Sequence, residues 1–232
     1  MFVERSDDGH TAWVLDHLGL AAFGRTREEA VARAAEAIDD HRRWCRVHRL
    51  PFGPASTGGV SVVEVTDDVE AVFSRDVEPA ADAEIVAGTV VLAATRADLL
   101  AVVGHLPDEV LDWDPPYRQF ASSADNRTIR ENLAHLANGE THHFLRAVGH
   151  RSPRPAAMPA AIWPDEFAER RREAMRFLQD LARSPDRARV TVIEGPTGAP
   201  ERWSVRKAMR RMVRHEILHT KSIRRIVAAY PG

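Results

Sequence analysis

The stretch RRMVRHEILHTKSIRR, from Arg210 to Arg225, decides the interpretation of the C-terminal half of the chain. It lies in a predicted helix that begins after Ser204, a typical N-cap residue, and continues to about Ala229. At about 100° per residue, the apolar side chains of this helix form one stripe. His219 falls in the middle of that stripe and His215 at its edge. Two imidazoles therefore occupy the face that should pack into a core.

These two histidines admit three interpretations. Burying imidazole nitrogens without partners costs a few kcal/mol, so the two rings are either hydrogen-bonded core residues or ligands of one metal ion. Residues four apart share a helix face, which suits a shared metal. The segment also matches the H-E-x-x-H motif of zinc peptidases, with Glu216 as general base. Extended forms of that motif need a ligand downstream, and residues 220–232 contain no His, Asp or Glu.

A third ligand is expected on a second predicted helix, from Thr128 to Val148. Helical periodicity places His135 well away from the centre of the apolar stripe of this helix and His143 nearer to it. His142 shares a face with His135 and also fits a surface position. The residues of the apolar stripe are Ile129, Leu133, Leu136, Phe144 and Ala147.

The remaining C-terminal segments complete a helical bundle. Further helices are predicted within about residues 83–104 and over about residues 165–182, and the segment RVTVIEGPTGAPERW favours a short hairpin or loop between the last two helices. Four long helices with at least one long connection indicate a four-helix bundle over residues 84–232.

The N-terminal part predicts a small α+β domain with the order ββαβ. Two short alternating segments flank an Asp-Gly turn at Gly9, which indicates a β-hairpin. A glycine-punctuated connection follows. Thr26 and Glu29 form a capping box that starts a helix ending near His48. The β-branched segment from Val60 to Val65 predicts another strand. With a linker at residues 74–84, the domains are predicted as 1–83 and 84–232.

Composition excludes several classes of protein. The net charge of −2 gives no general attraction to nucleic acid or to an anionic membrane. The single cysteine, Cys45, excludes a disulfide framework and favours a reducing compartment. We expect no membrane span, because no apolar run approaches about 18 residues, and the N-terminus lacks the features of a signal peptide. The sequence thus predicts a cytoplasmic protein.

The segments TIRENLAHLANGETHHFL (Thr128 to Leu145) and WSVRKAMRRMVRHEILHTKSIRRI (Trp203 to Ile226) together resemble the DinB family of four-helix-bundle proteins. The segment LPDEVLDWDPP, from Leu106 to Pro116, is also similar, so the resemblance covers about residues 84–232. It implies a divalent metal bound by three histidines. On the matching positions of this chain, these are His135, His215 and His219.

The same resemblance suggests functions. Some relatives resemble metal-dependent transferases that use low-molecular-weight thiols, so a zinc- or nickel-dependent thiol S-transferase acting on a small molecule is expected. Residues that could tune the site or contact substrate are Glu216, Glu140, His142 and His143. The alternatives are a non-catalytic binding or sensing module with a structural metal, and a bundle without metal. The family also implies a homodimer.

The segment DHLGLAAFGRTREEAVARAAEAI, from Asp16 to Ile38, resembles the HicB-type domain. The matching positions are Gly19, Gly24, Thr26, Glu29 and Ala30. The usual proline before Gly19 is missing, and no helix-turn-helix motif accompanies the segment. The resemblance implies a small α+β module that contacts a protein partner.

Overall fold

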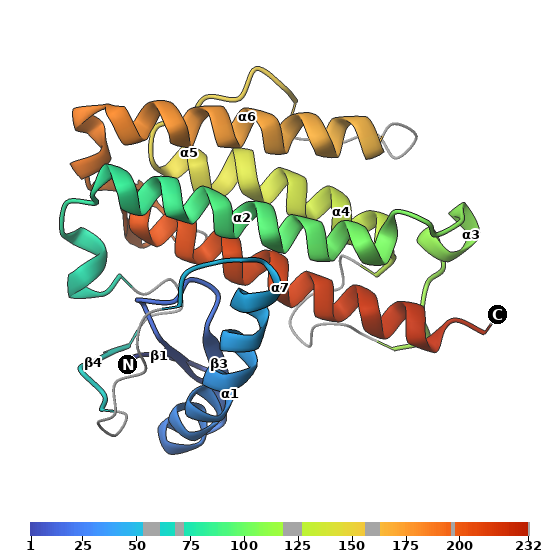
Figure 1. Cartoon of the computed structure of the whole chain (residues 1–232), viewed down its shortest axis with the longest axis horizontal. Coiled ribbons are helices and arrows are strands. Elements are labelled where there is room, and N and C mark those ends of the chain that lie inside the picture. The colour runs from blue at the N-terminus through green and yellow to red at the C-terminus, as the bar shows by residue number, and fades with distance from the viewer. Residues whose placement is uncertain (53–60, 68–71, 118–126, 156–162, 196–197, 232) are drawn as a thin grey trace.

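The computed structural model describes residues 1–52, 61–67, 72–117, 127–155, 163–195 and 198–231. Its N-terminal part is a four-stranded sheet with one helix against it (Figure 1). The strand order is β3-β2-β1-β4, in which β1 is antiparallel to β2 and parallel to β4. The elements are β1 (Phe2–Ser6), β2 (Gly9–Trp13), β3 (Ala21–Gly24), α1 (Arg27–Val47) and β4 (Glu64–Asp67).

The predicted α+β class is confirmed, with two differences in detail. The hairpin forms with Gly9 at a φ of 146°, a conformation that favours glycine, and Thr26 caps α1 as predicted by accepting a hydrogen bond from the Glu29 amide. The connection before α1 contains the unpredicted strand β3, which pairs with β2. The last strand starts at Glu64 instead of Val60, and Val60 itself lies outside the described residues.

The C-terminal part is mostly helical, as predicted, and its long helices lie side by side in Figure 1. The second predicted helix is divided, because a π-helical turn interrupts it. A two-stranded antiparallel hairpin precedes the last helix. After β4 the chain continues through η1 (Ser74–Val77), which connects the sheet to the helical part. The elements of the helical part are α2 (Asp82–Val103), α3 (Asp108–Leu111), α4 (Ile129–Asn138), η2 (Gly139–Phe144, the π turn), α5 (Leu145–Ala147), α6 (Trp163–Arg183), η4 (Pro185–Ala188), β5 (Thr191–Glu194), β6 (Pro200–Trp203) and α7 (Val205–Ala229).

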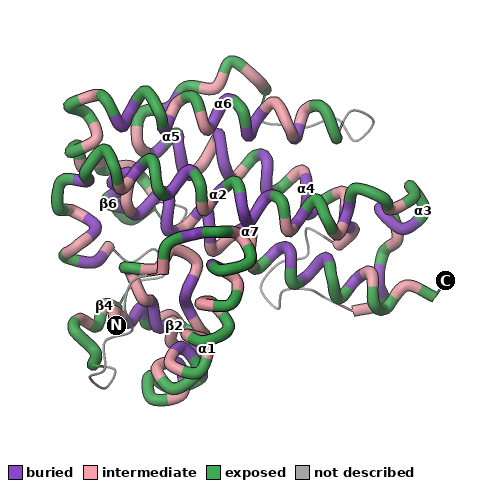
Figure 2. The backbone as a smooth tube through the Cα atoms, viewed as in Figure 1, coloured by how far each residue is buried: buried purple, intermediate pink, exposed green. Residues whose placement is uncertain are grey.

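Two apolar clusters fill the bundle along its length, and Figure 2 shows buried positions on the inner sides of the helices. One cluster centres on Leu92, Leu178 and Met209, and the other on Leu99, Leu133 and Ile223. Both clusters take residues from α2 and α7, so these two helices run through the whole core. The histidine-bearing part of α7 lies between the two clusters.

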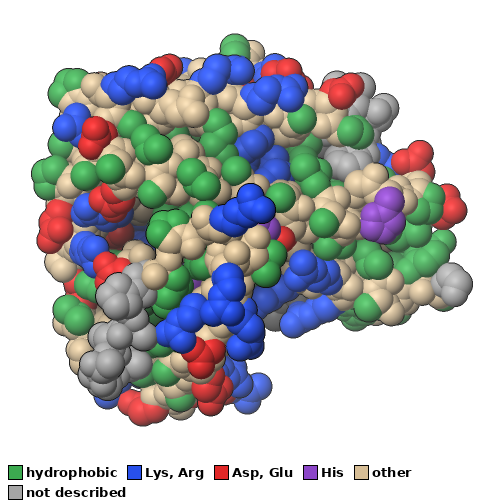
Figure 3. Space-filling model, in the orientation of Figure 1, with side chains coloured by type: hydrophobic (Ala, Val, Ile, Leu, Met, Phe, Trp, Pro, Cys, Tyr) green, Lys and Arg blue, Asp and Glu red, His purple; other side chains and the backbone are tan. Residues whose placement is uncertain are grey.

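Helix α2 is apolar on its outer side as well as its inner side. Val86, Val90 and Leu100 are exposed, and Figure 3 shows hydrophobic side chains on the face of the molecule where α2 lies. By length and composition this helix could cross a membrane, so the expectation that no apolar stretch approaches that length was wrong. A core helix passes the same test, and α2 packs against α6 and α7.

The N-terminal layer is attached to α7 by buried polar contacts. Arg210 forms an ion pair with Asp76 (2.6 Å) and lies over the Trp13 ring, while Arg211 forms an ion pair with Glu4 (2.9 Å). The Trp13 indole also donates a hydrogen bond to Glu4. Charged side chains on one face of α7 therefore position the sheet against the bundle.

Candidate metal centre

The structure brings together the three histidines to which the family resemblance pointed. The Nε2 atoms of His135 on α4 and His215 on α7 are 2.9 Å apart, and one ligand atom from each of His135, His215 and His219 lies within 4.8 Å of the others. Their residues are exposed, half-buried and buried, respectively. The cluster thus extends from the bundle interior to solvent, and its outer side is accessible to a small molecule.

Asn132 orients the deepest of these rings. Its side-chain oxygen lies 2.7 Å from Nδ1 of His219, and its amide nitrogen donates to the Thr128 carbonyl at 2.8 Å. The second bond fixes which end of the amide faces the ring, so the oxygen accepts a proton from Nδ1. Nε2 of His219 is then the unprotonated nitrogen of the ring, the one that can bind a metal. A hydrogen bond of this kind commonly fixes the tautomer of a metal-binding histidine.

The surroundings favour neutral rings at two of the three positions. Burial lowers the pKa of His219 to about 3, with a further contribution from nearby His135. Burial, followed by the proximity of His219, His135 and His143, holds the pKa of His215 well below its ordinary value. A neutral imidazole is the form that binds a metal, so these rings need no deprotonation at neutral pH.

The spacing of the nitrogens fits a divalent ion at the His135–His215 side. Metal–nitrogen bonds of about 2.0–2.1 Å place two ligand nitrogens about 2.9 Å apart at a right angle and about 3.4 Å apart in a tetrahedron. The observed 2.9 Å lies at the short end of this range. The ligand atoms of all three histidines lie within 4.8 Å of one another. The donor set of three imidazoles suits zinc and nickel.

The π turn explains where the other histidines of this helix lie. Gly139 begins the turn, and a Cβ at this position would lie 3.1 Å from Cε1 of His215, so the glycine allows the rings to approach closely. Beyond it, the His143 ring meets the rings of Phe144 and Trp203 edge-on, outside the three-histidine cluster. His142 is close to Arg170 and Glu173, and desolvation by burial is the main cause of its lowered pKa.

A buried cluster of four charges lies beneath the histidines. Two glutamates and two arginines, all nearly inaccessible, alternate around it and cancel in charge. The guanidinium of Arg96 also lies over the ring of Phe167, 3.8 Å from its centroid. The pairs are Arg96–Glu216 (2.5 Å), Arg96–Glu140 (2.9 Å), Arg171–Glu216 (2.9 Å) and Arg171–Glu140 (3.0 Å).

This cluster decides the role of Glu216. Burial alone would raise its pKa, but the guanidinium groups of Arg171 and Arg96 outweigh burial and lower it. The carboxylate also accepts a hydrogen bond from the Thr95 hydroxyl at 2.5 Å. A carboxylate with a lowered pKa and three donors around it is a weak base. Glu216 is therefore unsuited to the peptidase role, and it supports α7 from below the histidines.

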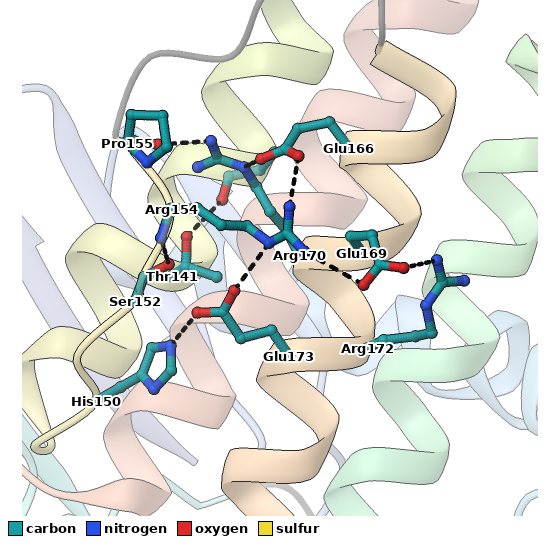
Figure 4. A network of polar contacts seen from close by, with 11 residues as sticks. Thr141, His150, Ser152, Arg154, Pro155, Glu166, Glu169, Arg170, Arg172 and Glu173 are labelled. Carbon is teal, nitrogen blue, oxygen red and sulfur yellow. Dashed lines mark hydrogen bonds and ion pairs between the residues drawn. The ribbon is translucent and has the colours of Figure 1, made fainter.

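A second polar network lies on the far side of the π turn, between α6 and residues 150–155 (Figure 4). Glu173 accepts a hydrogen bond from His150 (2.6 Å) and forms an ion pair with Arg154 (3.3 Å). Arg154 also pairs with Glu166, which in turn pairs with Arg170. The network fastens the segment after α5 to α6, and all its carboxylates have cationic partners.

Sequence reasoning missed the residues that support the cluster. Asn132 stands beside Leu133 on the apolar stripe of its helix, and Arg96 interrupts the most apolar helix of the chain. A polar residue on an apolar face is a usable signal for both. The periodicity that favoured His143 over His135 assumed a continuous α-helix, and it expected a ligand at the centre of the stripe. The cluster instead lies at the rim of the core.

Comparison with known proteins agrees with this geometry. The sequence pattern of the DinB superfamily matches residues 92–223, which includes all three histidines and most of the helical part. No curated protein and no solved structure matches the chain. The match covers more than half of the 232 residues. The chain therefore belongs to the DinB superfamily.

Proposed function

We propose that the chain is an enzyme that acts on a small molecule. It binds one divalent metal ion, zinc or nickel, through His135, His215 and His219, and the ion takes part in the reaction. The observation that carries this proposal is the cluster itself, in which ligand atoms from a buried ring oriented by Asn132, a half-buried ring and an exposed ring lie within 4.8 Å of one another. Three protein ligands leave at least one coordination position open, which is the arrangement of catalytic sites. Because His135 is exposed, that position is open to solvent.

A low-molecular-weight thiol is the co-substrate that we propose. Zinc or nickel held by three neutral imidazoles would lower the pKa of a thiol and favour the nucleophilic thiolate. Glu140 and Glu216, the two carboxylates of the buried cluster beneath the histidines, are held by arginines, so neither is suited to act as a base. A thiol suits such a site, because its proton can leave to water once its pKa is lowered. A thiol S-transferase is the reaction class that results.

A cavity that could hold a substrate is separated from the His215 ring by the side chain of Phe144. This cavity of about 470 Å³ lies between the end of the second bundle helix and the β5–β6 hairpin. His143 lies in its wall. The Phe144 ring contacts both the His143 ring and the His215 ring. The wall includes His142, His143, Arg146, Arg151, Glu194 and Glu201. This wall combines imidazoles and guanidiniums with two carboxylates, so it favours a polar substrate that forms hydrogen bonds.

Turnover tests this function. The full chain, loaded with zinc or with nickel, is assayed for consumption of thiols paired with 1-chloro-2,4-dinitrobenzene and other small electrophiles. We expect metal-dependent turnover that His215→Ala abolishes and the exposed control His105→Ala leaves unchanged. Metal-loaded protein that consumes none of the pairs would contradict the enzyme proposal while leaving metal binding intact.

One observation favours a second candidate, a binding or sensing module with a structural metal. Both carboxylates beneath the histidines are committed to ion pairs, which is a structural arrangement as much as a catalytic one. In that case the N-terminal domain would contact a protein partner, and Phe23, exposed on the edge strand β3, would lie in the contact. Affinity capture with the full chain should recover a partner that Phe23→Ser loses. Equal recovery by both proteins would argue against this candidate.

A further inference from the structure

A second cavity lies at the junction of the N-terminal layer and the bundle, lined by other residues than the histidine cluster. Its volume is about 210 Å³. Its walls come from five segments: the connection after β2, α1 with the residues after it, η1, α2 and α7. Gly88 on α2 lies at its base, where a Cβ would come within 2.6 Å of the Met209 sulfur. The cavity exists only where both parts of the chain meet.

The charged groups around this cavity cancel one another. Three arginines and three carboxylates line it, and each guanidinium is paired with one carboxylate. A charged ligand would have to compete with these existing pairs, so the lining favours an uncharged one. The pairs are Arg75–Asp16 (2.5 Å), Arg206–Glu84 (2.5 Å) and Arg210–Asp76 (2.6 Å).

Flat rings form one wall. The His41 and Trp44 rings stack with centroids 5.3 Å apart and 26° between their planes. His17 lies 6.0 Å from His41, and its ring stacks on Phe52 at 4.1 Å. The lining also includes aliphatic and thioether side chains, among them Val91 and Met209. Aromatic and apolar side chains together favour contact with the face of a planar apolar molecule.

The two imidazoles supply hydrogen-bonding groups to the cavity. Within the described parts of the chain, neither His17 nor His41 bonds another residue through its ring nitrogens. Burial, with a smaller effect of His17, lowers the pKa of His41 to about 4, so that ring is neutral at pH 7. A neutral imidazole offers one donor and one acceptor, which matches a hydroxyl group.

We propose that this cavity binds an uncharged monocyclic aromatic molecule that carries a hydroxyl group. Its ring lies against His41 and Trp44, and its hydroxyl group bonds the His41 imidazole. The size agrees with this class, because a cavity of about 150 Å³ holds benzene and about 210 Å³ leaves room for one or two substituents. The proposal is independent of the metal and of the proposed reaction.

Calorimetric titration of the full chain with p-cresol tests this inference. We expect binding of one molecule per chain, with a dissociation constant of about millimolar or tighter, as so small a ligand allows. Ala87→Phe places a ring in the cavity from an exposed position of α2 and should weaken binding at least about tenfold. Ala93→Phe, on the same helix but outside the lining, is the matched control and should bind as the wild type does.

Three comparisons define the ligand class. His41→Phe keeps the ring and removes the nitrogens, so it should weaken p-cresol binding about tenfold and leave toluene binding unchanged. Benzoate, which is charged, should bind more weakly than p-cresol. Absence of p-cresol binding, equal binding by Ala87→Phe, or a preference for benzoate or toluene would each overturn the proposal.

Discussion

At the scale of single residues, Asn132 is the group on which the geometry of the metal centre depends. It holds His219 through Nδ1 and is itself held by the Thr128 carbonyl. Replacing such a partner of a metal-binding histidine commonly lowers metal affinity about 10–100-fold. We therefore expect Asn132→Ala to lose zinc affinity within that range, measured by competition with a chelator.

The control for this change is Asn138→Ala, at an exposed position on the same helix. It should keep the affinity of the wild type. Asn132→Ala with unchanged affinity would mean that Asn132 is a packing residue and that the orientation of His219 comes from elsewhere.

The lowered pKa of His41 determines the direction in which the free energy of unfolding changes with pH. Its pKa is about 4 in the folded chain, against a usual value of about 6.5. Between these values the unfolded chain binds the proton and the folded chain does not, so the free energy of unfolding falls as pH decreases through this window. His41→Phe removes the effect, and its urea midpoint should fall less than that of the wild type between about pH 7.5 and pH 5.

The exposed His105 supplies the matched control, because His105→Phe should follow the wild type. Metal-free protein is used for all three, so that metal release does not enter. If His41→Phe and the wild type lose the same stability on acidification, the His41 ring is not desolvated as described.

At the scale of elements, the four-charge cluster couples three helices and the π turn. Arg96 belongs to α2, Arg171 to α6 and Glu216 to α7, while Glu140 belongs to the turn. Removing one member of a buried ion pair costs about 3–5 kcal/mol, because its partner stays buried with its charge. We expect Glu216→Gln to lower the free energy of unfolding by about that amount in urea denaturation.

Glu109→Gln changes the same group at an exposed position and should shift stability by less than about 0.5 kcal/mol. A stable Glu216→Gln variant that has lost activity would contradict the structural role. Such a result would indicate that Glu216 acts as the general base.

The helices and strands also show how much of the fold could be predicted from the sequence alone. Helix ends could be predicted where the signal is local, as at Thr26, Thr128 and Ser204, each of which caps a helix. The π turn could not be predicted from local sequence, because Glu140 in this turn contacts arginines on two other helices. Strand β3 has a short Ala-Ala-Phe-Gly sequence with little β propensity, and pairing with β2 forms it. Long-range contacts decided the elements that local patterns missed.

The same division holds for the candidate metal centre. The pair His215 and His219 followed from helical spacing, and His135 followed from the family resemblance against the periodicity of its helix. Asn132 and the arginines required the tertiary structure, since nothing near them in sequence names their partners. Site residues on a single helix could be predicted from its spacing, whereas contacts between residues on different helices could not.

At the scale of the whole molecule, the junction between the sheet and α7 joins the two parts of the chain. Asp76 and Arg210 are both buried there, and Arg210 also lies over Trp13 and Phe73. Asp76→Asn removes the charge that pairs with Arg210, so it should loosen the N-terminal layer more than the bundle. We expect hydrogen exchange to rise in β1 to β3 and to stay unchanged in α6.

Asp39→Asn, at an exposed position of α1, should leave exchange as in the wild type. Equal acceleration of exchange in β1 to β3 and in α6 would show that the chain unfolds as one unit. The junction would then not separate two parts of different stability.

The most direct test of the metal centre is elemental analysis of the full chain after exposure to zinc and, separately, to nickel, followed by removal of free ions. We expect about one ion per chain, lost in His135→Ala, His215→Ala and His219→Ala and retained in His143→Ala. No bound ion in the wild type, or an ion that survives His219→Ala and is lost in His143→Ala, would contradict it.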